Sequence, residues 1–401
     1  MFYFYQYPIM KKIVFTEEFC SPENLFPFTL TRQVQDIRVG ILTIREKWEL
    51  ALESESFDKY EGDYKDLDRS FILEEQVEND TLYLVHGNIL PSSKLIKQVK
   101  KLKGGDMIMV PEKEAIVYCI TKKEIVETNK IKVRKSIDAI DDVKEICFPW
   151  DIFQVNAWAL NEDVNLLKKT RSFQKISSTN KLTAPENIFI EKGAKVEHCI
   201  INAEQGAVYI AKGAVVMEGC CLRGPLSVGE GAVVKMGSKI YGATTIGPHC
   251  IVGGEIKNSV FFGYSNKAHD GYIGDSVIGE WCNLGAGTSN SNIKNNASDV
   301  MVYTPQGLQN AGKKCGVFMG DYSRTAINTS FNTGTVVGVS ANVYGAGLSP
   351  KFIPNFSWGY EGIERYDMQR ALTDIEKWKE FKNEMLSGNE TIILKHIFDH
   401  Y

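Results

Sequence analysis

Residues 210–252 read IAKGAVVMEGCCLRGPLSVGEGAVVKMGSKIYGATTIGPHCIV, and this stretch decides the fold. Counted in sixes, every due position is aliphatic: Ile210, Val216, Leu222, Val228, Val234, Ile240, Ile246 and Val252. A fixed repeat of this kind marks a solenoid. Six is the period of neither an α-helix nor a two-faced strand. It suits a triangular coil whose sides are each one short strand and a turn, so the sequence predicts a left-handed parallel β-helix.

The same series extends to both sides of this stretch. Ile190 and Val196 belong to it, shifted two residues by an insertion near residues 202–206. After Val252 the count fails, because Asn258 stands where an aliphatic is due. The segment 261–271, FFGYSNKAHDG, is predicted to be a loop ejected from the solenoid, and the repeat resumes at Ile273, Ile278 and Leu284. A break in a solenoid often marks a functional site.

The rest of the chain has a different character. Most of the 34 glycines follow residue 190. Before that point, apolar runs alternate with helical spacing, which indicates a layered, Rossmann-like α/β unit. Strands are predicted at 12–15, 81–85, 107–110 and 115–120, and helices at 37–52 and 95–102. We therefore expect an α/β domain over 10–180, a left-handed β-helix over 186–358 and a helical tail over 361–401.

The tail is predicted from helical spacing. Apolar residues recur at Met368, Leu372, Ile375, Trp378, Phe381 and Met385. The sequence Ser387-Gly388-Asn389 is a fitting stop signal. We expect one amphipathic helix that packs on the outside of another part of the protein.

Composition excludes several classes of protein. Of 401 residues, 43% are hydrophobic and 24% charged, and the formal net charge is −4. This balance gives no reason to expect a nucleic-acid or anionic-membrane partner. No apolar run approaches the roughly 18 residues of a membrane helix. The nine cysteines are odd in number and lack a C-x-x-C pattern, which favours reduced thiols in a cytoplasm. Met10 reads as the true start, with residues 1–9 as an upstream extension.

Residues 254–288 contain groups suited to acyl transfer. They read GEIKNSVFFGYSNKAHDGYIGDSVIGEWCNLGAGT. A neutral imidazole such as that of His269 can take a proton from an attacking amine. Lys257 or Lys267 could neutralise a sugar phosphate, although Lys267 could equally be a solvated turn residue. A lone histidine is more often a packing or surface residue, and His269 stands out because it lies in the predicted break.

The same stretch resembles the acetyltransferase half of the bifunctional N-acetylglucosamine-1-phosphate uridyltransferase / glucosamine-1-phosphate N-acetyltransferase family, in a divergent bacterial branch. The resemblance implies a hexapeptide-repeat acyltransferase of UDP-N-acetylglucosamine biosynthesis that uses acetyl-CoA and an amino-sugar 1-phosphate. Anchored on Tyr272-Ile273-Gly274-Asp275, it implies that His269 is catalytic. It implies substrate binding by Lys257, Tyr272, Asn283 and Asn292, and it implies a homotrimer.

Two departures from the family pattern bear on the acceptor. The family reads K-A-G-H where this chain reads Lys267-Ala268-His269, and the family's C-N-Y becomes Ser291-Asn292-Ile293. The second change removes an aromatic residue that helps to hold the sugar phosphate. Both departures weaken the assignment of unmodified glucosamine 1-phosphate as the acceptor. They do not weaken the assignment of acyl transfer as the class of reaction.

The N-terminal sequence LTRQVQDIRVGILTIREKW, residues 30–48, is similar to the nucleotidyltransferase piece of the same branch. The resemblance implies nucleotide binding by Thr31, Arg32, Arg38, Lys47 and Asn88, with UTP or dTTP as substrate and Mg²⁺ as cofactor. The usual glycine-rich loop is absent near residue 15, and Asn88 is a poorer Mg²⁺ ligand than a carboxylate.

Two functional interpretations follow. The first is a cytoplasmic acetyltransferase joined to a sugar-1-phosphate nucleotidyltransferase. The alternative is a sugar-nucleotide-binding or scaffolding protein with a degenerate nucleotidyltransferase domain. The segment around His269 favours the first, whereas Asn88 and the missing glycine loop favour the second for the N-terminal half.

Overall fold

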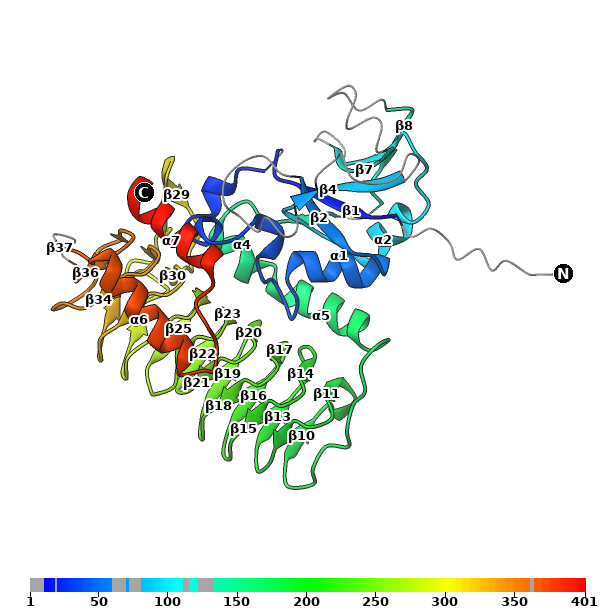
Figure 1. Cartoon of the computed structure of the whole chain (residues 1–401). Coiled ribbons are helices and arrows are strands. Elements are labelled where there is room, and N and C mark those ends of the chain that lie inside the picture. The colour runs from blue at the N-terminus through cyan, green and yellow to red at the C-terminus, as the bar shows by residue number, and fades with distance from the viewer. Residues whose placement is uncertain are drawn as a thin grey trace. The chain divides into compact units, whose positions relative to one another are not determined.

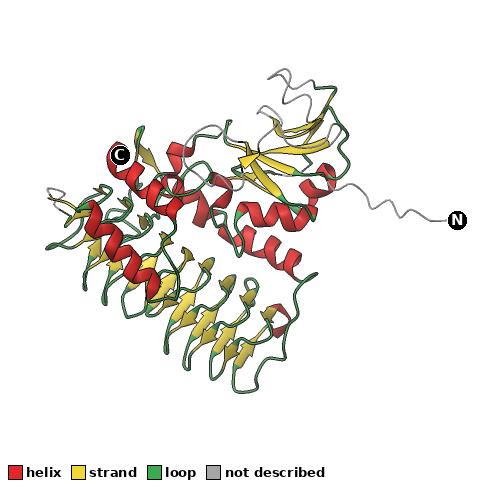
Figure 2. Cartoon of the chain, viewed as in Figure 1, coloured by secondary structure: helices red, strands yellow, loops and turns green. Residues whose placement is uncertain are grey.

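The computed structural model describes residues 11–18, 20–59, 70–71, 81–110, 115–121, 133–140, 142–360 and 364–401. The proposed extension at residues 1–9 lies outside these ranges. The chain divides into two compact units, which are described separately. Unit 1 comprises 1–21, 34–36 and 43–146, and unit 2 comprises 22–33, 37–42 and 147–401. Figures 1 and 2 show the elements of both.

Unit 1 is built on a seven-stranded mixed sheet in the order β3-β2-β1-β4-β7-β6-β8. The strands are β1 (Ile13–Thr16), β2 (Ser56–Lys59), β3 (Ser70–Phe71), β4 (Thr81–His86), β6 (Asp106–Met109), β7 (Ala115–Thr121) and β8 (Lys135–Asp138). A separate pair joins β5 (Ile89–Leu90) to β9 (Lys144–Glu145). The central strands β1 and β4 are parallel and almost wholly buried, which confirms the predicted α/β class.

Among the described residues of unit 1, the α-helices beside this sheet are α1 (Ile44–Leu52) and α2 (Ser93–Val99). The helix predicted from residue 37 is wrong in its first turns. Helix α1 begins after Thr43, whose side chain accepts the amide of Glu46 in a capping box. Upstream, Gly40 has φ +82°, which a continuous helix does not allow.

Unit 2 contains the predicted solenoid, a left-handed β-helix with three parallel faces (Figure 1). The first face consists of β10 (Lys181–Thr183), β13 (Ile200–Asn202), β16 (Cys221–Arg223), β19 (Lys239–Tyr241), β22 (Glu255–Lys257) and β25 (Tyr272–Gly274). The second consists of β11 (Ile188–Ile190), β14 (Val208–Ile210), β17 (Leu226–Val228), β20 (Thr244–Ile246), β23 (Val260–Gly263), β26 (Val277–Glu280), β30 (Val317–Met319), β33 (Thr335–Val337) and β35 (Phe352–Ile353).

The third face begins with β12 (Lys195–Val196), β15 (Val215–Val216), β18 (Val233–Val234), β21 (Ile251–Val252) and β24 (Asn266–Lys267). It continues, through single bridges at Asn283, into β31 (Arg324–Thr325), β34 (Asn342–Val343), β36 (Ser357–Trp358) and β37 (Glu364–Arg365). The residues of the hexad series are buried and stack coil on coil, as predicted: Val216 pairs with Val234, and Val234 pairs with Val252.

The predicted ejected loop at 261–271 is wrong. Strands β23 and β24 stay in the solenoid, with Phe261 opposite Ile278 and Lys267 opposite Val252. Val234 and its partner Val252 are 18 residues apart, but Val252 and Lys267 are only 15 apart. The count in sixes therefore fails because the turns of this coil are shorter, and Ile256 rather than Asn258 points inward.

The long excursion lies later in the chain. Strand β27 (Ser289–Asn290) pairs with β32 (Ser330–Phe331), and residues 291–316 leave the coil between β27 and β30. Within this excursion, β28 (Met301–Thr304) and β29 (Gly307–Asn310) form an antiparallel hairpin.

The α-helices described in unit 2 are α4 (Pro149–Gln154), α5 (Asn156–Leu167), α6 (Met368–Glu380) and α7 (Gly388–His400). The predicted tail helix is confirmed as α6, but it ends before Phe381 and Met385, which are exposed. Ser387 does not stop a helix. It caps the start of α7, a second helix that the spacing did not reveal. Leu372, Ile375 and Leu394 pack with Trp281 and Phe356 of the solenoid.

Asn156, the first residue of α5, ties that helix to the solenoid. Its side-chain amide donates to the carbonyl of Ala243 at 2.7 Å and to Thr245 Oγ1 at 3.1 Å. Among the described residues, no helix has the length and apolar character needed to cross a membrane.

Candidate active site

Three of the predicted substrate-binding residues lie together on the first face of the solenoid. Lys257 ends β22, Tyr272 begins β25, and Asn292 enters the excursion directly after β27. Lys257 pairs with Gly274. The ring of Tyr272 lies over Gly274, since a Cβ there would be 2.2 Å from the phenol oxygen. Tyr272 Oη therefore lies beside Gly274, the residue that pairs with Lys257 in the neighbouring strand.

The side chain of Asn292 reaches this group through its amide. Asn292 Nδ2 donates to Tyr272 Oη at 3.0 Å and to Asp275 Oδ2 at 2.5 Å. The other carboxylate oxygen of Asp275 accepts a hydrogen bond from Asn258 Nδ2 at 2.6 Å. Asp275 is 4% exposed, so a buried carboxylate joins two amide side chains and, through one of them, the phenol.

The phenols on this face are held in their protonated form. Burial, with the negative charge of Asp275, raises the pKa of Tyr272 to about 12. Tyr241, in the preceding coil, donates to Glu255 Oε1 at 2.7 Å, and this hydrogen bond raises the pKa of Tyr241 to about 12. Both hydroxyls are therefore hydrogen-bond donors at neutral pH.

His269 is exposed at the corner between β24 and β25, three residues before Tyr272. The corner below it is short: two glycines, Gly253 and Gly254, separate β21 from β22, whereas residues 268–271 separate β24 from β25. A Cβ at Gly253 would be 2.4 Å from the carbonyl oxygen of Ala268, so only glycine fits beneath this corner.

Lys267 points into the solenoid rather than toward solvent. Its side chain is 1% exposed, and its ammonium group donates to the carbonyl of Gly253 at 3.2 Å and to the carbonyl of His269. Burial lowers the pKa of Lys267 to about 8. The solvated-turn interpretation of Lys267 is therefore wrong. This cation is part of the packing that holds the His269 corner to the corner below it.

Asn283 lies on the third face, apart from Lys257, Tyr272 and Asn292. It bridges between Asn266 and Arg324, and its side-chain oxygen faces Asn266 Nδ2 at 3.5 Å. Arg324 donates in turn to the carbonyl of Asp374 in α6. One chain thus places the five substrate-binding candidates on two faces of the solenoid, with Lys267 on the third face beside Asn283.

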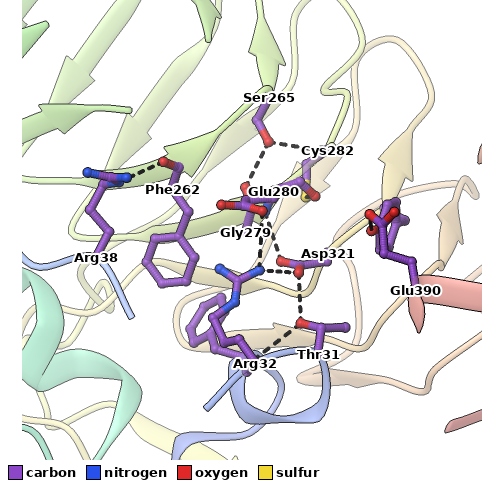
Figure 3. A network of polar contacts seen from close by, with 12 residues as sticks. Thr31, Arg32, Arg38, Phe262, Ser265, Gly279, Glu280, Cys282, Asp321 and Glu390 are labelled. Atoms are coloured by element: carbon purple, nitrogen blue, oxygen red, sulfur yellow. Dashed lines mark hydrogen bonds and ion pairs between the residues drawn. The ribbon is translucent and has the colours of Figure 1, made fainter. Parts of the chain in front are cut away.

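Three predicted nucleotide-binding residues belong to unit 2 and contact the solenoid (Figure 3). Arg32 forms an ion pair with Asp321 and lies 3.7 Å from Glu280, while Thr31 Oγ1 donates to Asp321 Oδ2 at 2.7 Å. Burial opposes the charge of Arg32, but the two carboxylates outweigh it and raise its pKa. Arg38 Nε donates to the carbonyl of Phe262 at 2.9 Å.

The other two belong to unit 1. Lys47 is a buried residue of α1, and Asn88 Oδ1 accepts from the thiol of Cys20 at 3.3 Å. The described part of the chain contains no group of three or more His, Cys, Asp or Glu residues able to hold a metal. The amide oxygen of Asn88 is a poorer Mg²⁺ ligand than a carboxylate, and Mg²⁺ takes most of its oxygen ligands from water and substrate phosphates.

The sequence reasoning missed several residues of these networks. Asp275 had a signal, because it closes the Tyr-Ile-Gly-Asp motif. Asn258 was noted only because it stands at a position of the six-residue repeat where an aliphatic residue is expected. Asp321, the partner of Arg32 from 289 positions away, had no signal that a single sequence can carry.

Comparison with known proteins agrees with this architecture. Residues 13–172 match the family model described as sugar nucleotidyl transferase. A bifunctional protein GlmU of Methanocaldococcus jannaschii is 27% identical over 295 residues, 73% of this chain and 64% of that protein. A bifunctional sugar-1-phosphate nucleotidylyltransferase/acetyltransferase of Sulfurisphaera tokodaii is 35% identical over 107 residues, 26% of this chain and 25% of that protein.

The chain thus spans slightly less than two thirds of the length of the first relative and a quarter of the second. These relatives are archaeal, whereas the sequence resemblance pointed to a bacterial branch. The family match covers the α/β part of the chain, and the six-residue repeat forms the solenoid that follows it. Residues 13–172 thus resemble a sugar nucleotidyl transferase domain, a left-handed β-helix follows them, and the chain as a whole is similar to bifunctional GlmU proteins.

Proposed function

We propose that the solenoid is an acetyl-CoA-dependent N-acetyltransferase whose acceptor is an amino-sugar 1-phosphate, with glucosamine 1-phosphate as the first candidate. The observation that carries the proposal is the group on the first face: the half-buried residue Lys257, the protonated phenol of Tyr272 and the amide of Asn292. A cation and hydrogen-bond donors on one surface suit a phosphate. His269 lies in the corner that leads into β25, three residues before Tyr272. The relative from Sulfurisphaera tokodaii, a bifunctional sugar-1-phosphate nucleotidylyltransferase/acetyltransferase, supports both transferase activities.

In the proposed reaction the amine of the sugar attacks the thioester carbonyl of acetyl-CoA. The new C–N bond forms as His269 accepts the amine proton, and the C–S bond then breaks with return of that proton to the leaving thiolate, which gives free CoA thiol. The thioester oxygen gains negative charge during the attack, and backbone N–H groups can stabilise it. The nine cysteines are all thiols. We place the reaction in a cytoplasm, where thiols stay reduced.

Lys257→Ala tests the phosphate contact. A charge-assisted contact contributes about 1.5–3 kcal/mol, so we expect KM for glucosamine 1-phosphate to rise about 10- to 100-fold with little change in kcat. The measurement is CoA thiol release with acetyl-CoA. Lys239→Ala is the matched control, since Lys239 is an exposed cation in the preceding coil of the same face. An equal rise in KM for both variants would contradict the assignment of Lys257.

We expect a homotrimer. The flat faces of a triangular solenoid can pack around a threefold axis, and cyclic closure satisfies every interface. A trimer would also let Asn283 of one copy serve a site formed with another copy, since one chain places it on a separate face from Tyr272. Light scattering at micromolar concentration should give three times 45.0 kDa. A mass near 45 kDa would exclude the trimer.

For the N-terminal domain we propose nucleotidyl transfer to the sugar 1-phosphate, giving a UDP- or dTDP-sugar. The family match over residues 13–172 supports it. UTP or dTTP with Mg²⁺ should bind in calorimetry, and Arg38→Ala should lower that affinity. The competing function is a degenerate domain that binds a sugar nucleotide or supports assembly, favoured by the existing ion pair of Arg32 and the single amide oxygen of Asn88. Absence of binding by any nucleoside triphosphate at millimolar concentration would favour the degenerate domain.

A further inference from the structure

The side chain of Asp275 is linked by hydrogen bonds to two asparagine amides, and through one of them to the phenol of Tyr272. It is buried, and the described residues place no ion-pair cation within 4 Å of it. Both of its oxygens accept from amide side chains, Asn258 Nδ2 and Asn292 Nδ2. A carboxylate has only acceptors, so it fixes which end of each amide faces it. Asn292 must therefore present its NH₂ group to Asp275.

This orientation has a consequence for Tyr272. The same NH₂ group of Asn292 donates to Tyr272 Oη at 3.0 Å. Since an amide nitrogen cannot accept, the phenol hydrogen must point elsewhere. Among the described residues, no acceptor receives it. The phenol stays protonated because its pKa is about 12, so it keeps one O–H donor for a ligand.

We propose that Asp275 is a positioning residue that sets the polarity of this chain of hydrogen bonds, so that Tyr272 Oη donates to an anionic oxygen of the substrate beside Lys257. The inference deepens the proposed function, on which it rests for the identity of the sugar phosphate. The position of the phenol over Gly274, opposite Lys257 in the strand pairing, brings donor and cation to one place.

The backbone of Asp275 also holds the excursion that brings Asn292 to the site. Its carbonyl accepts the amide of Gly316 at 2.7 Å, at the end of the excursion. A substitution keeps this backbone bond, but removing the carboxylate takes away the acceptor of both Asn258 and Asn292, which would weaken local structure as well as polarity. A test must separate these two effects.

The exchange variant Asp275→Asn/Asn292→Asp separates them. The carboxylate then stands at residue 292 and accepts from the new amide at 275, whose oxygen still accepts from Asn258. The network keeps its charge and its hydrogen bonds. However, Tyr272 Oη now faces the carboxylate at residue 292, which can only accept. The O–H of Tyr272 must therefore donate to that carboxylate and can no longer donate to the ligand.

The experiment is a mutant cycle, in which the effect of Tyr272→Phe on binding is measured both in the parent and in the exchange variant. Calorimetry gives the affinity for glucosamine 1-phosphate and for inorganic phosphate. We expect Tyr272→Phe to weaken binding about tenfold in the parent and by less than twofold in the exchange variant, while the exchange variant keeps the parent's thermal stability. Asp275→Asn alone should lose both affinity and stability.

An equal loss on Tyr272→Phe in both backgrounds would overturn the inference, and so would parent-like affinity of the exchange variant. Failure of the parent to bind either anion at millimolar concentration would also overturn it. If the parent binds phosphate but transfers no acetyl group, the proposed function fails while the cycle on phosphate still decides the role of Asp275.

Discussion

His269→Ala is expected to lower kcat for acetyl transfer by about 10²–10⁴, the usual contribution of a positioned general base. KM for the sugar phosphate should change less, because the base acts mainly in the transition state. The side chain is exposed at a corner, so the loss should come without loss of fold or assembly. The measurement is thiol release at saturating acetyl-CoA, with circular dichroism and light scattering on the same sample.

Met236→Ala is the matched control for this variant. Met236 occupies the equivalent corner of an earlier coil, two residues after Val234 as His269 is two after Lys267, and it is 68% exposed. We expect it to keep the parent's kcat. Near-normal acetyl transfer by His269→Ala to every amino sugar that the parent accepts would remove the base from the proposed mechanism, and the corner would then be architecture only.

Arg32→Ala is expected to destabilise unit 2 by about 3–5 kcal/mol, the typical cost of removing one partner of a buried ion pair. Its side chain is 10% exposed and that of Asp321 is 3% exposed. The variant leaves the carboxylate of Asp321 buried without its guanidinium, and it removes the cation that lies over the ring of Phe262 at 4.9 Å.

Hydrogen exchange at the amide of Glu280 is a local measure of this effect, because that amide donates to Asp321 Oδ1 at 2.8 Å. Thr31→Ala is the control: it removes one hydrogen bond to the same carboxylate and should cost about 1–3 kcal/mol. If Arg32→Ala lowers nucleoside triphosphate affinity while exchange at Glu280 stays unchanged, Arg32 acts on nucleotide rather than on the solenoid.

The solenoid could be predicted from the sequence alone, because one aliphatic side chain per six residues is a local requirement of each strand and turn. Cysteine, polar or charged residues at inward positions are missed when only aliphatic residues are counted. Lys267 is the example, since its buried ammonium is satisfied by two backbone carbonyls rather than by apolar packing. The count also failed at Asn258, because coil length changed while the inward column continued through Ile256.

The motif likewise predicted Lys257, Tyr272, Asn292 and His269 as site residues, since they lie within 36 residues of one another. The tertiary structure decided what these residues contact. It separated Asn283 from Tyr272, because consecutive strands of a triangular coil face different sides. It also brought Thr31 and Arg32 to Asp321, across 290 and 289 positions. A pairing over that distance depends on how the coils stack and on the energy of burying a charge, and neither is a property of the local sequence.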